Sequence, residues 1–536
     1  MSDYDYIIVG AGSAGCVLAN RLSANAGKRV LLLEAGGRDR NPWLHIPVGY
    51  FKTIHNPNTD WCYKTEPDPG LNGRSIDWPR GKTLGGSSSI NGLLYIRGQQ
   101  QDYNHWRQLG NIGWSFKDVL PYFRRSENQE CGGNDFHGVG GPLAVSNMRF
   151  KSAICDAFID AAGEIGIPRN EDFNGKEQEG AGYFQLTTRK GLRCSTAVAY
   201  LNPIRQRSNL DIITHALAQR IIFENGNTSV NGLHYSTDHN THYAGLKPGG
   251  EVILSGGAIG SPQVLQVSGI GPGELLNRLG IPVIRDVPGV GKNLQDHLQI
   301  RMVYKVNVPT LNDKINSVFG RMLIGMEYMF RRSGPMAIGA SQVCVFAKTS
   351  PNIDAPDIQY HFQQLSADKP GIKMHPFSGI TASVCQLRPQ SVGRIEIKSP
   401  NVVNYPAIHP NYLSAAVDQD TTIAAMHFTR KLMGTKILEP FIVEEMAPGP
   451  KAQTDEQLLD SARNISQTIY HPVGTCKMGS DLDSVVDNRL RVIGFKGLRV
   501  VDASIMPTIT SGNTNAPVIM IAEKAADLIC EDAKAS

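Results

Sequence analysis

The chain opens with Asp5-Tyr-Ile-Ile-Val-Gly-Ala-Gly-Ser-Ala-Gly15, an apolar segment that leads directly into a glycine-rich turn. The apolar segment predicts a β-strand, and a helix should begin near Ser13. Gly10 permits a tight turn, Gly12 lets the backbone approach a pyrophosphate, and Gly15 allows close helix packing. The free N–H groups and the positive dipole end of the helix would face the phosphates. This arrangement is typical of a dinucleotide-binding site.

A second predicted strand, Arg29 to Leu33, ends at Glu34. Glu34 follows Gly15 by nineteen residues, a spacing at which an acid accepts hydrogen bonds from ribose hydroxyls. A glycine turn alone would be weak support, but here a strand precedes it and an acid follows it. The fingerprint fits a nicotinamide dinucleotide as well as a flavin one, so a nicotinamide dehydrogenase stays open at this point.

The composition is that of a globular protein, with 536 residues of which 41% are hydrophobic and 19% charged. This length predicts two domains. A net charge of +4 without a basic run does not indicate nucleic-acid binding. Nine cysteines without a C-x-x-C pair predict reduced thiols and no metal site. No secretory signal precedes the first strand, and no apolar stretch reaches the roughly 18 residues of a membrane span, so we expect a cytoplasmic protein.

Two segments stand out between the predicted elements. Residues 40–80, rich in Pro, Asn and Asp, are predicted to be a loop excursion that covers something, anchored by Trp43, Trp61 and Tyr63. Val318 to Phe330 has bulky apolar residues at helical spacing and is followed by two arginines. We interpret it as a helix that packs on a domain rather than lies on a bilayer. Its methionines would then belong to the core, namely Met322, Met326 and Met329.

The pattern of predicted secondary structure changes twice in the rest of the chain. Alternating apolar stretches in residues 300–400, such as Gln342 to Ala347 and Gly393 to Lys398, predict an antiparallel sheet. The final part again predicts an apolar strand followed by a helix, as at the start of the chain: a short strand from Gly497 to Asp502 and a helix from Val518 to Ile529. The nucleotide domain is therefore predicted to be assembled from both ends of the chain.

Several segments together resemble the glucose-methanol-choline (GMC) oxidoreductase family of flavoproteins. One family signature is matched from Gly81 through Leu84-Gly-Gly-Ser-Ser and Ile90 to Gly98, and a second by Gly257-Ala-Ile-Gly-Ser-Pro-Gln-Val-Leu-Gln-Val-Ser-Gly-Ile-Gly271. Three further stretches are most similar to the bacterial alcohol dehydrogenases of the family: His471 to Met478, Val501 to Pro507 and Asn513 to Pro517. That group includes enzymes acting on aliphatic alcohols, polyethylene glycol, sorbose and choline.

The resemblance implies an α/β fold in which a Rossmann-like FAD-binding domain is interleaved with an α+β substrate domain built on an antiparallel sheet. The FAD-binding domain would consist of residues 1–150, 190–300 and 465–536, with a lid-like excursion at 40–80. The substrate domain would consist of residues 151–189 and 301–464.

The resemblance also implies FAD as the cofactor. It would be bound non-covalently, because Ile90 stands where some choline-oxidising relatives carry a flavin-linking histidine. The ADP half would be held by Gly10, Gly12, Ser13, Ala14, Gly15, Glu34, Ala35, Ala218 and Ala258. The remainder would be held by Leu84, Gly86, Asn91, Gly92, Leu93, Asp502, Ala503, Thr514 and Asn515. In this set Asp502 would accept a hydrogen bond from the ribityl or pyrophosphate region.

For catalysis the resemblance implies His471 as the base and Asn513 as its partner. An alcohol that becomes a carbonyl loses a hydroxyl proton and a hydride, and a flavin accepts only the hydride. An imidazole with a pKa near about 6.5 can accept the proton at neutral pH, and the amide of Asn513 could hold the substrate oxygen. The dipeptide Asp296-His297 is interpreted as a helix or loop cap outside the site.

The expected activity is oxidation of a primary alcohol to an aldehyde, with electrons passed to a quinone or another carrier. An oxidase that reduces O2, a choline dehydrogenase and a flavin-containing hydroxynitrile lyase stay open. The expected partners are a small-molecule alcohol and an electron acceptor, without nucleic acid or metal. The quinone-linked relatives also leave open a peripheral attachment at the inner face of the membrane.

Overall fold

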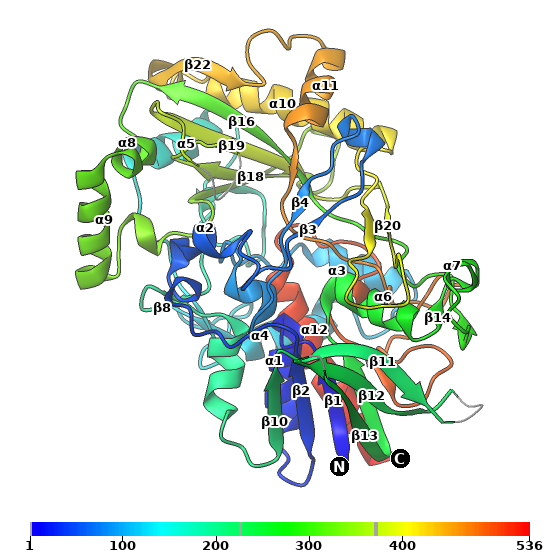
Figure 1. Ribbon diagram of the computed structural model, residues 1–536. Helices are drawn as coiled ribbons and strands as arrows, with labels where there is room; N and C mark the ends of the chain where they lie inside the picture. Colours follow the sequence, from blue (N-terminus) through cyan, green and yellow to red (C-terminus); the bar gives the residue numbers. More distant parts are fainter. Residues whose placement is uncertain (1–2, 225–227, 239, 369–372, 536) are drawn as a thin grey trace.

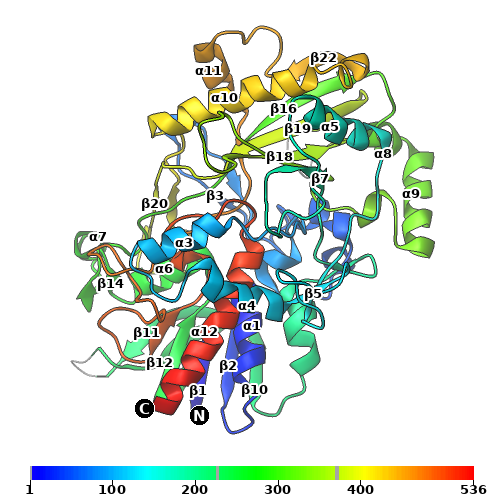
Figure 2. The same ribbon diagram turned by 180° about the vertical axis from the view of Figure 1, so that it is seen from behind.

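Two large β-sheets form the framework of the protein in the computed structural model, which describes residues 3–224, 228–238, 240–368 and 373–535. The first sheet lies in the lower half of Figure 1, near both ends of the chain, and the second lies in the upper half. Figure 2 shows the same arrangement from behind, with α12 (Asn515–Ala535) beside α1 (Ser13–Leu22).

The first sheet is built around the glycine fingerprint. β1 (Tyr4–Val9), α1 and β2 (Val30–Glu34) form a βαβ unit in which the two strands pair in parallel. β10 (Leu210–Thr214) extends the parallel sheet beyond β2, and β13 (Asn240–Leu254) pairs with β1 on the other side. The predicted order of strand, glycine turn, helix and second strand is confirmed.

β13 is long enough to take part in two kinds of pairing. Its second half runs parallel to β1 and to β24 (Leu498–Val500), whereas its first half is antiparallel to β12 (Val230–Thr237). β11 (Leu217–Phe223) completes this antiparallel edge. An ion pair of 2.7 Å between Arg21 and Glu523 joins α1 to α12. Segments from the two ends of the chain therefore share one sheet and one core.

The second sheet is antiparallel throughout and has the order β22-β16-β19-β18-β17-β7, with β23 beside β16. Its strands are β7 (Gly180–Tyr183), β16 (Leu298–Val306), β17 (Val343–Ala347), β18 (Ile358–Gln363), β19 (Gly379–Gln386), β22 (Ile442–Ala447) and β23 (Gln467–Thr468). The predicted fold class, a parallel nucleotide-binding sheet combined with an antiparallel one, is confirmed.

The two faces of the second sheet differ in polarity because side chains alternate along a strand. Met302 and Phe362 lie on one face, in an apolar core that α5 (Ala153–Glu164) and α10 (Ala416–Met433) cover. Figure 1 draws α10 across the top of this sheet. The opposite face presents Gln299, Arg301, His361 and Gln363 to a cavity. Polar groups buried on a sheet face need partners, and here they border space in which a ligand can bind.

The other helices and strands lie outside the two large sheets. The helices are α2 (Tyr50–Thr53), α3 (Gln100–Gln108), α4 (Phe116–Ser126), α6 (Gly257–Val267), α7 (Gly273–Arg278), α8 (Leu311–Asn316), α9 (Val318–Arg331) and α11 (Asp455–Ile465). The remaining strands form pairs: β3 (Tyr63–Lys64) with β4 (Asp77–Trp78), β5 (Glu127–Gln129) with β6 (Leu143–Val145), β8 (Thr188–Arg189) with β9 (Leu192–Arg193), β14 (Ile270–Gly271) with β15 (Arg285–Asp286), and β20 (Arg394–Glu396) with β21 (Ala407–His409). The stretch from Gly393 to Lys398 thus forms a separate ribbon and does not join the large sheet.

Helix α9 forms where the spacing predicts it and contacts the protein through the buried Tyr328, but the prediction that its other bulky apolar side chains pack on a domain is wrong. Phe319 and Phe330 are 64% and 79% exposed. The three methionines predicted to belong to the core, Met322, Met326 and Met329, are also exposed. Helical spacing identifies an apolar helix but does not say what covers it. Figures 1 and 2 both draw α9 at the outer edge of the molecule.

Candidate active site

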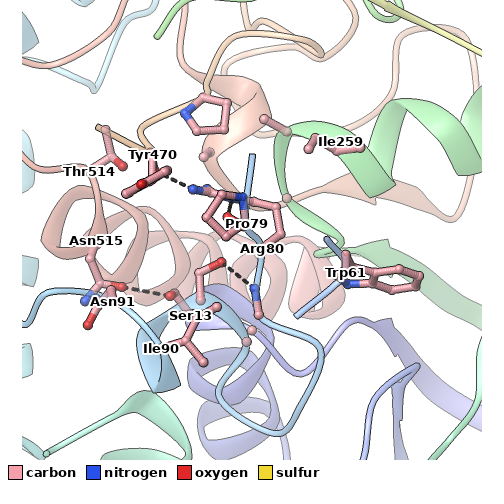
Figure 3. A pocket seen from close by; sticks show the side chains of 18 of the residues that line it. Ser13, Trp61, Pro79, Arg80, Ile90, Asn91, Ile259, Tyr470, Thr514 and Asn515 are labelled. Atoms are coloured by element: carbon pink, nitrogen blue, oxygen red, sulfur yellow. Dashed lines mark hydrogen bonds between the residues drawn. The ribbon is translucent and has the colours of Figure 1, made fainter. Parts of the chain in front are cut away.

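The polar face of the second sheet and the glycine turns of the first border one cavity of about 320 Å³, which is within the range of small-molecule sites. Nearly all predicted site residues line it: Gly10, Gly12, Ser13, Ala14, Glu34, Ala35, Gly86, Asn91, Gly92, Leu93, Ala218, Ala258, His471, Asp502, Ala503, Asn513, Thr514 and Asn515. Figure 3 looks into this cavity and shows Ser13 next to Asn515, with a hydrogen bond of 2.8 Å between their side chains.

The excursion at residues 40–80 forms part of the cavity wall through Tyr50, Phe51, Trp61 and Tyr63. Trp61 and Tyr63 stack with ring centroids 5.7 Å apart. Trp43 does not anchor the excursion by burial, because it is 39% exposed. What the excursion covers is therefore the cavity.

The two glycine-rich turns touch each other and leave no room for side chains. Gly10 has a φ of +99°, and a Cβ there would lie 2.6 Å from the carbonyl oxygen of Ser255. A Cβ on Gly86 would lie 2.7 Å from the Cα of Gly12. Above them, the first turn of α1 has no side-chain cap at Gly12, so its N–H groups are available to an anionic ligand.

Two predicted cofactor residues do not line the cavity. A Cβ on Gly15 would lie 1.9 Å from the carbonyl oxygen of Gly10, so Gly15 permits packing between the turn and the helix. Leu84 is 2% exposed and belongs to the core of the first sheet. The side chain of Leu84 packs in that core and not in the cavity wall, and its predicted contact with the flavin stays a prediction.

The two carboxylates of the cavity wall both hold backbone. Glu34 accepts hydrogen bonds from the N–H groups of Ala11 (2.9 Å) and Gly36 (2.8 Å), and burial raises its pKa to about 7. Asp502 accepts four hydrogen bonds, two from Ser504 and one each from Gly257 and Ser261. Asp502 thus ties the end of β24 to the start of α6, and its predicted bond to the cofactor stays a prediction.

The protonation of His471 follows from its contact with His297. Their Nδ1 atoms lie 3.0 Å apart, and Nε2 of His297 lies 2.9 Å from the carbonyl oxygen of Leu387. A carbonyl can only accept, so Nε2 of His297 carries the hydrogen and its Nδ1 is an acceptor. Burial lowers the pKa of His297 to about 4 and keeps it neutral. His471 therefore donates from Nδ1, which leaves a lone pair on its Nε2.

Asn513 faces that lone pair. Its Nδ2 lies 3.1 Å from Nε2 of His471, and its Oδ1 lies 3.5 Å from Nε2 of Gln359. Burial, with His297, His361 and Arg80 nearby, lowers the pKa of His471 well below the ordinary value of 6.5. The site thus places a neutral imidazole with a free lone pair beside an amide donor at one wall of the cavity.

Asp296 fixes the backbone from which His471 projects. It accepts hydrogen bonds from the N–H of His471 (2.7 Å), from the hydroxyl of Thr468 (2.5 Å) and from the hydroxyl of Tyr412. Burial raises the pKa of Asp296 to about 6. Asp296 is a loop cap, as interpreted, but the placement of Asp296-His297 outside the site is wrong: Asp296 holds the backbone of His471, and His297 contacts its imidazole.

Comparison with known proteins identifies the family to which the chain belongs. Two family models described as GMC oxidoreductase match residues 4–299 and 389–522. The chain belongs to the GMC oxidoreductase family. It is 44% identical to the alcohol dehydrogenase [acceptor] of Pseudomonas putida, over 98% of this chain and 95% of that protein. It is 41% identical to the mitochondrial choline dehydrogenase of Mus musculus, over 98% of this chain and 89% of the relative.

Solved structures of other enzymes share the fold. Pyridoxine 4-oxidase from Mesorbium loti superposes with a TM-score of 0.89 at 31% identity, covering 98% of this chain and 99% of that one. A formate oxidase superposes with a TM-score of 0.92 at 26% identity, covering 99% of both. Like its family, this GMC oxidoreductase is an enzyme, and FAD is its cofactor.

The cavity fits FAD. Gly10 and Gly86 let the two turns pack together, a Cβ on Gly12 would meet no protein atom nearer than 4.0 Å, and the uncapped start of α1 suits a pyrophosphate. Ile90, 3% exposed, lines the cavity with a side chain that has no nucleophilic atom. Among the described residues, no group of three or more His, Cys, Asp or Glu side chains could hold a metal ion.

Several groups that border the cavity or support it were not among the predicted site residues. His297 supports His471, and Arg301, His361 and Gln363 project from β16 and β18. His297 adjoins Asp296 in the dipeptide interpreted as a cap, whereas Arg301, His361 and Gln363 alternate with apolar residues along β16 and β18 and belong to no motif. Only the pairing of β16 and β18 with β19 places them on one face.

Proposed function

We propose that this GMC oxidoreductase is an FAD-dependent dehydrogenase that oxidises a primary alcohol to an aldehyde and passes the electrons to a quinone or another carrier. The observation that supports it best is the lone pair on Nε2 of His471, 3.1 Å from the Nδ2 donor of Asn513. The relatives named alcohol dehydrogenase [acceptor] and choline dehydrogenase support the class of reaction.

His471 and Asn513 offer an alcohol two complementary contacts. A hydroxyl placed between them donates its hydrogen to Nε2 of His471 and accepts a hydrogen bond from Nδ2 of Asn513. FAD, when bound, supplies the acceptor for the hydride that leaves the alcohol carbon. His471 takes the hydroxyl proton, and His297 accepts the hydrogen bond from Nδ1 that stabilises the resulting imidazolium. The hydroxyl proton then stays on His471, and the carbonyl product carries no O–H hydrogen.

In the same proposal FAD is held without a covalent bond. The turn from Gly10 to Ala14, together with Glu34, would hold its ADP half, and Asn91, Leu93 and the start of α12 would hold the flavin. Ile90 cannot form a covalent link. Precipitating the protein with acid should therefore release the yellow cofactor into the supernatant, and a yellow pellet would contradict the proposal.

Anaerobic addition of a primary alcohol to the yellow holoprotein tests the reaction class. We expect the flavin absorption to bleach, because the substrate transfers a hydride. An unchanged spectrum during cleavage of a cyanohydrin would indicate a hydroxynitrile lyase, and turnover that requires added NAD would indicate a nicotinamide enzyme. We expect an artificial dye to be reduced faster than O2 is consumed, whereas the opposite order would indicate an oxidase.

We also propose that the protein works in the cytoplasm and attaches peripherally to the inner face of the membrane. The exposed apolar side chains of α9, with Arg321 on the helix and Arg331 and Arg332 at its end, form a surface suited to anionic lipid headgroups. All nine cysteines are free, which suits a reducing compartment. No helix in the described part of the chain has the length and apolarity to cross a membrane.

A further inference from the structure

Arg301 is a buried cation on the second-sheet side of the cavity. Its side chain projects from β16 on the polar face of the second sheet and is 6% exposed. It makes no hydrogen bond or ion pair with any residue that the structure describes, and its Nε is buried without a partner. Burial lowers the pKa of this guanidinium.

The other buried arginines have partners. Arg97 pairs with Glu127 at 2.6 Å, and Arg499 with Glu251 at 2.5 Å. Arg193, which has no carboxylate, donates instead to oxygens of Ser88, Asn91 and Pro47. A buried charge without a partner is strongly unfavourable. Arg301 therefore differs from the structural arginines of this chain in a way that indicates a ligand.

The groups around Arg301 leave it without a counter-charge inside the cavity. The phenols of Tyr50 and Tyr470 are close enough for its charge to lower the pKa of each, against the larger rise caused by burial. Asp368 contributes at longer range, but its side chain is 80% exposed and pairs with His375 at 3.0 Å. Among the described residues that line the cavity, the only carboxylates are Glu34 and Asp502, which hold backbone at the predicted cofactor end.

We propose that Arg301 binds a carboxylate on the substrate, so that the substrate class is an alcohol with a carboxylate at its far end. The planar guanidinium offers two parallel N–H donors that match a carboxylate. The hydroxyls of Tyr50 and Tyr470 supply further donors at the same wall. A quaternary ammonium such as choline would instead meet a buried positive charge.

The position of Arg301 along β16 gives the scale of this substrate. His297, which contacts His471, lies four residues before Arg301, a backbone separation of about 13 Å at roughly 3.3 Å per strand residue. The arginine side chain covers part of that distance. A hydroxyl at His471 and a carboxylate at Arg301 therefore need several carbon atoms between them, so a short hydroxy acid such as glycolate should not reach both.

This inference rests on the proposed alcohol oxidation, and the experiment separates the two. Wild-type holoprotein is supplied with ω-hydroxyalkanoates of about four to ten carbons and with the methyl esters of the same acids. We expect a kcat/KM for the best acid on the order of 100-fold above its ester, since a buried ion pair is lost in the ester. Equal kcat/KM values would overturn the inference while leaving alcohol oxidation intact.

Arg301→Met removes the charge and keeps the length of the side chain. In this variant kcat/KM for the acid should fall on the order of 100-fold, while kcat/KM for the ester should change little. Arg301→Lys should recover only part of the loss, because lysine lacks the two-donor fork. Lys305→Met, which removes a cation from the same strand outside the cavity wall, should leave the preference for the acid unchanged. An equal loss for acid and ester in Arg301→Met would contradict the inference.

A binding measurement covers the case in which no alcohol is oxidised. Hexanoate, which has no hydroxyl, should perturb the flavin spectrum of wild-type holoprotein and leave that of Arg301→Met unchanged. If hexanoate binds in this way but no alcohol bleaches the flavin, the carboxylate site stands and the proposed oxidation is wrong. If hexanoate does not bind the wild type, the carboxylate site is wrong.

Discussion

At the scale of single residues, the proposed chemistry depends on one imidazole, that of His471, whose neighbours leave its Nε2 as an acceptor. The resemblance predicts that His471 and Asn513 lie together, because both stand in motifs, and the structure places them 3.1 Å apart, while their catalytic roles stay a prediction. His297 could not be assigned, because its contact with His471 spans 174 positions and no motif contains it. The tautomer of His471 follows only from the hydrogen bond between His297 and the carbonyl of Leu387.

Replacing His297 tests this positioning role. His297→Phe keeps the ring shape but removes the acceptor for Nδ1–H of His471, so kcat should fall on the order of 10- to 100-fold with KM and bound FAD nearly unchanged. His427→Phe, at a surface histidine that pairs with Asp455, should have no effect and serves as the control. A normal kcat in His297→Phe with intact flavin would show that the contact does not orient the base.

The pH dependence reports the same imidazole. His471 acts as a base only when it is unprotonated, and its pKa is lowered well below 6.5, chiefly by burial. Activity should therefore persist as pH falls through 6.5 and decline only when pH reaches the lowered pKa. The check is kcat/KM with a neutral alcohol between about pH 4.5 and 8. A midpoint at or above the ordinary histidine value would contradict the assigned environment.

At the scale of elements, the sequence predicts whether a segment is a helix or a strand better than it predicts what that segment packs against. β1, α1, β2 and α12 form as expected, because the glycine turn and the apolar periodicity are local signals. The prediction that the apolar side chains of α9 are buried is wrong for most of them. Apolar periodicity identifies a helix face but does not say whether protein covers that face. The pairing of β20 with β21, and not with the large antiparallel sheet, likewise depends on contacts that no local pattern predicts.

The exposed face of α9 can be tested with vesicles that contain phosphatidylserine. The wild type should sediment with them at low salt, and the double variant Phe319→Ser/Phe330→Ser should bind at least tenfold more weakly, because each phenylalanine contributes about 1.5–3 kcal/mol when buried. Leu482→Ser removes an exposed apolar side chain (96% exposed) from elsewhere on the surface and is the control. Equal sedimentation of the wild type and the double variant would rule out α9 as the contact.

At the scale of the whole molecule, the site exists because two sheets meet. Glycine turns of the first sheet supply one wall, and the polar face of the second supplies the opposite wall. The proposed domain boundaries stay a prediction; β23, from the segment assigned to the FAD-binding domain, pairs with β16 of the second sheet. The substrate wall could not be derived from the sequence, since it requires alternate residues of separate strands to share one face.

The central claim is that His471 removes the proton of an alcohol whose hydride goes to FAD. The most direct test is the anaerobic rate of flavin bleaching in a single turnover, compared between wild type and His471→Ala with equal FAD content. We predict rapid bleaching in the wild type and a rate lower by on the order of 100-fold or more in the variant. Bleaching at the wild-type rate in His471→Ala, with its flavin spectrum intact, would contradict the account.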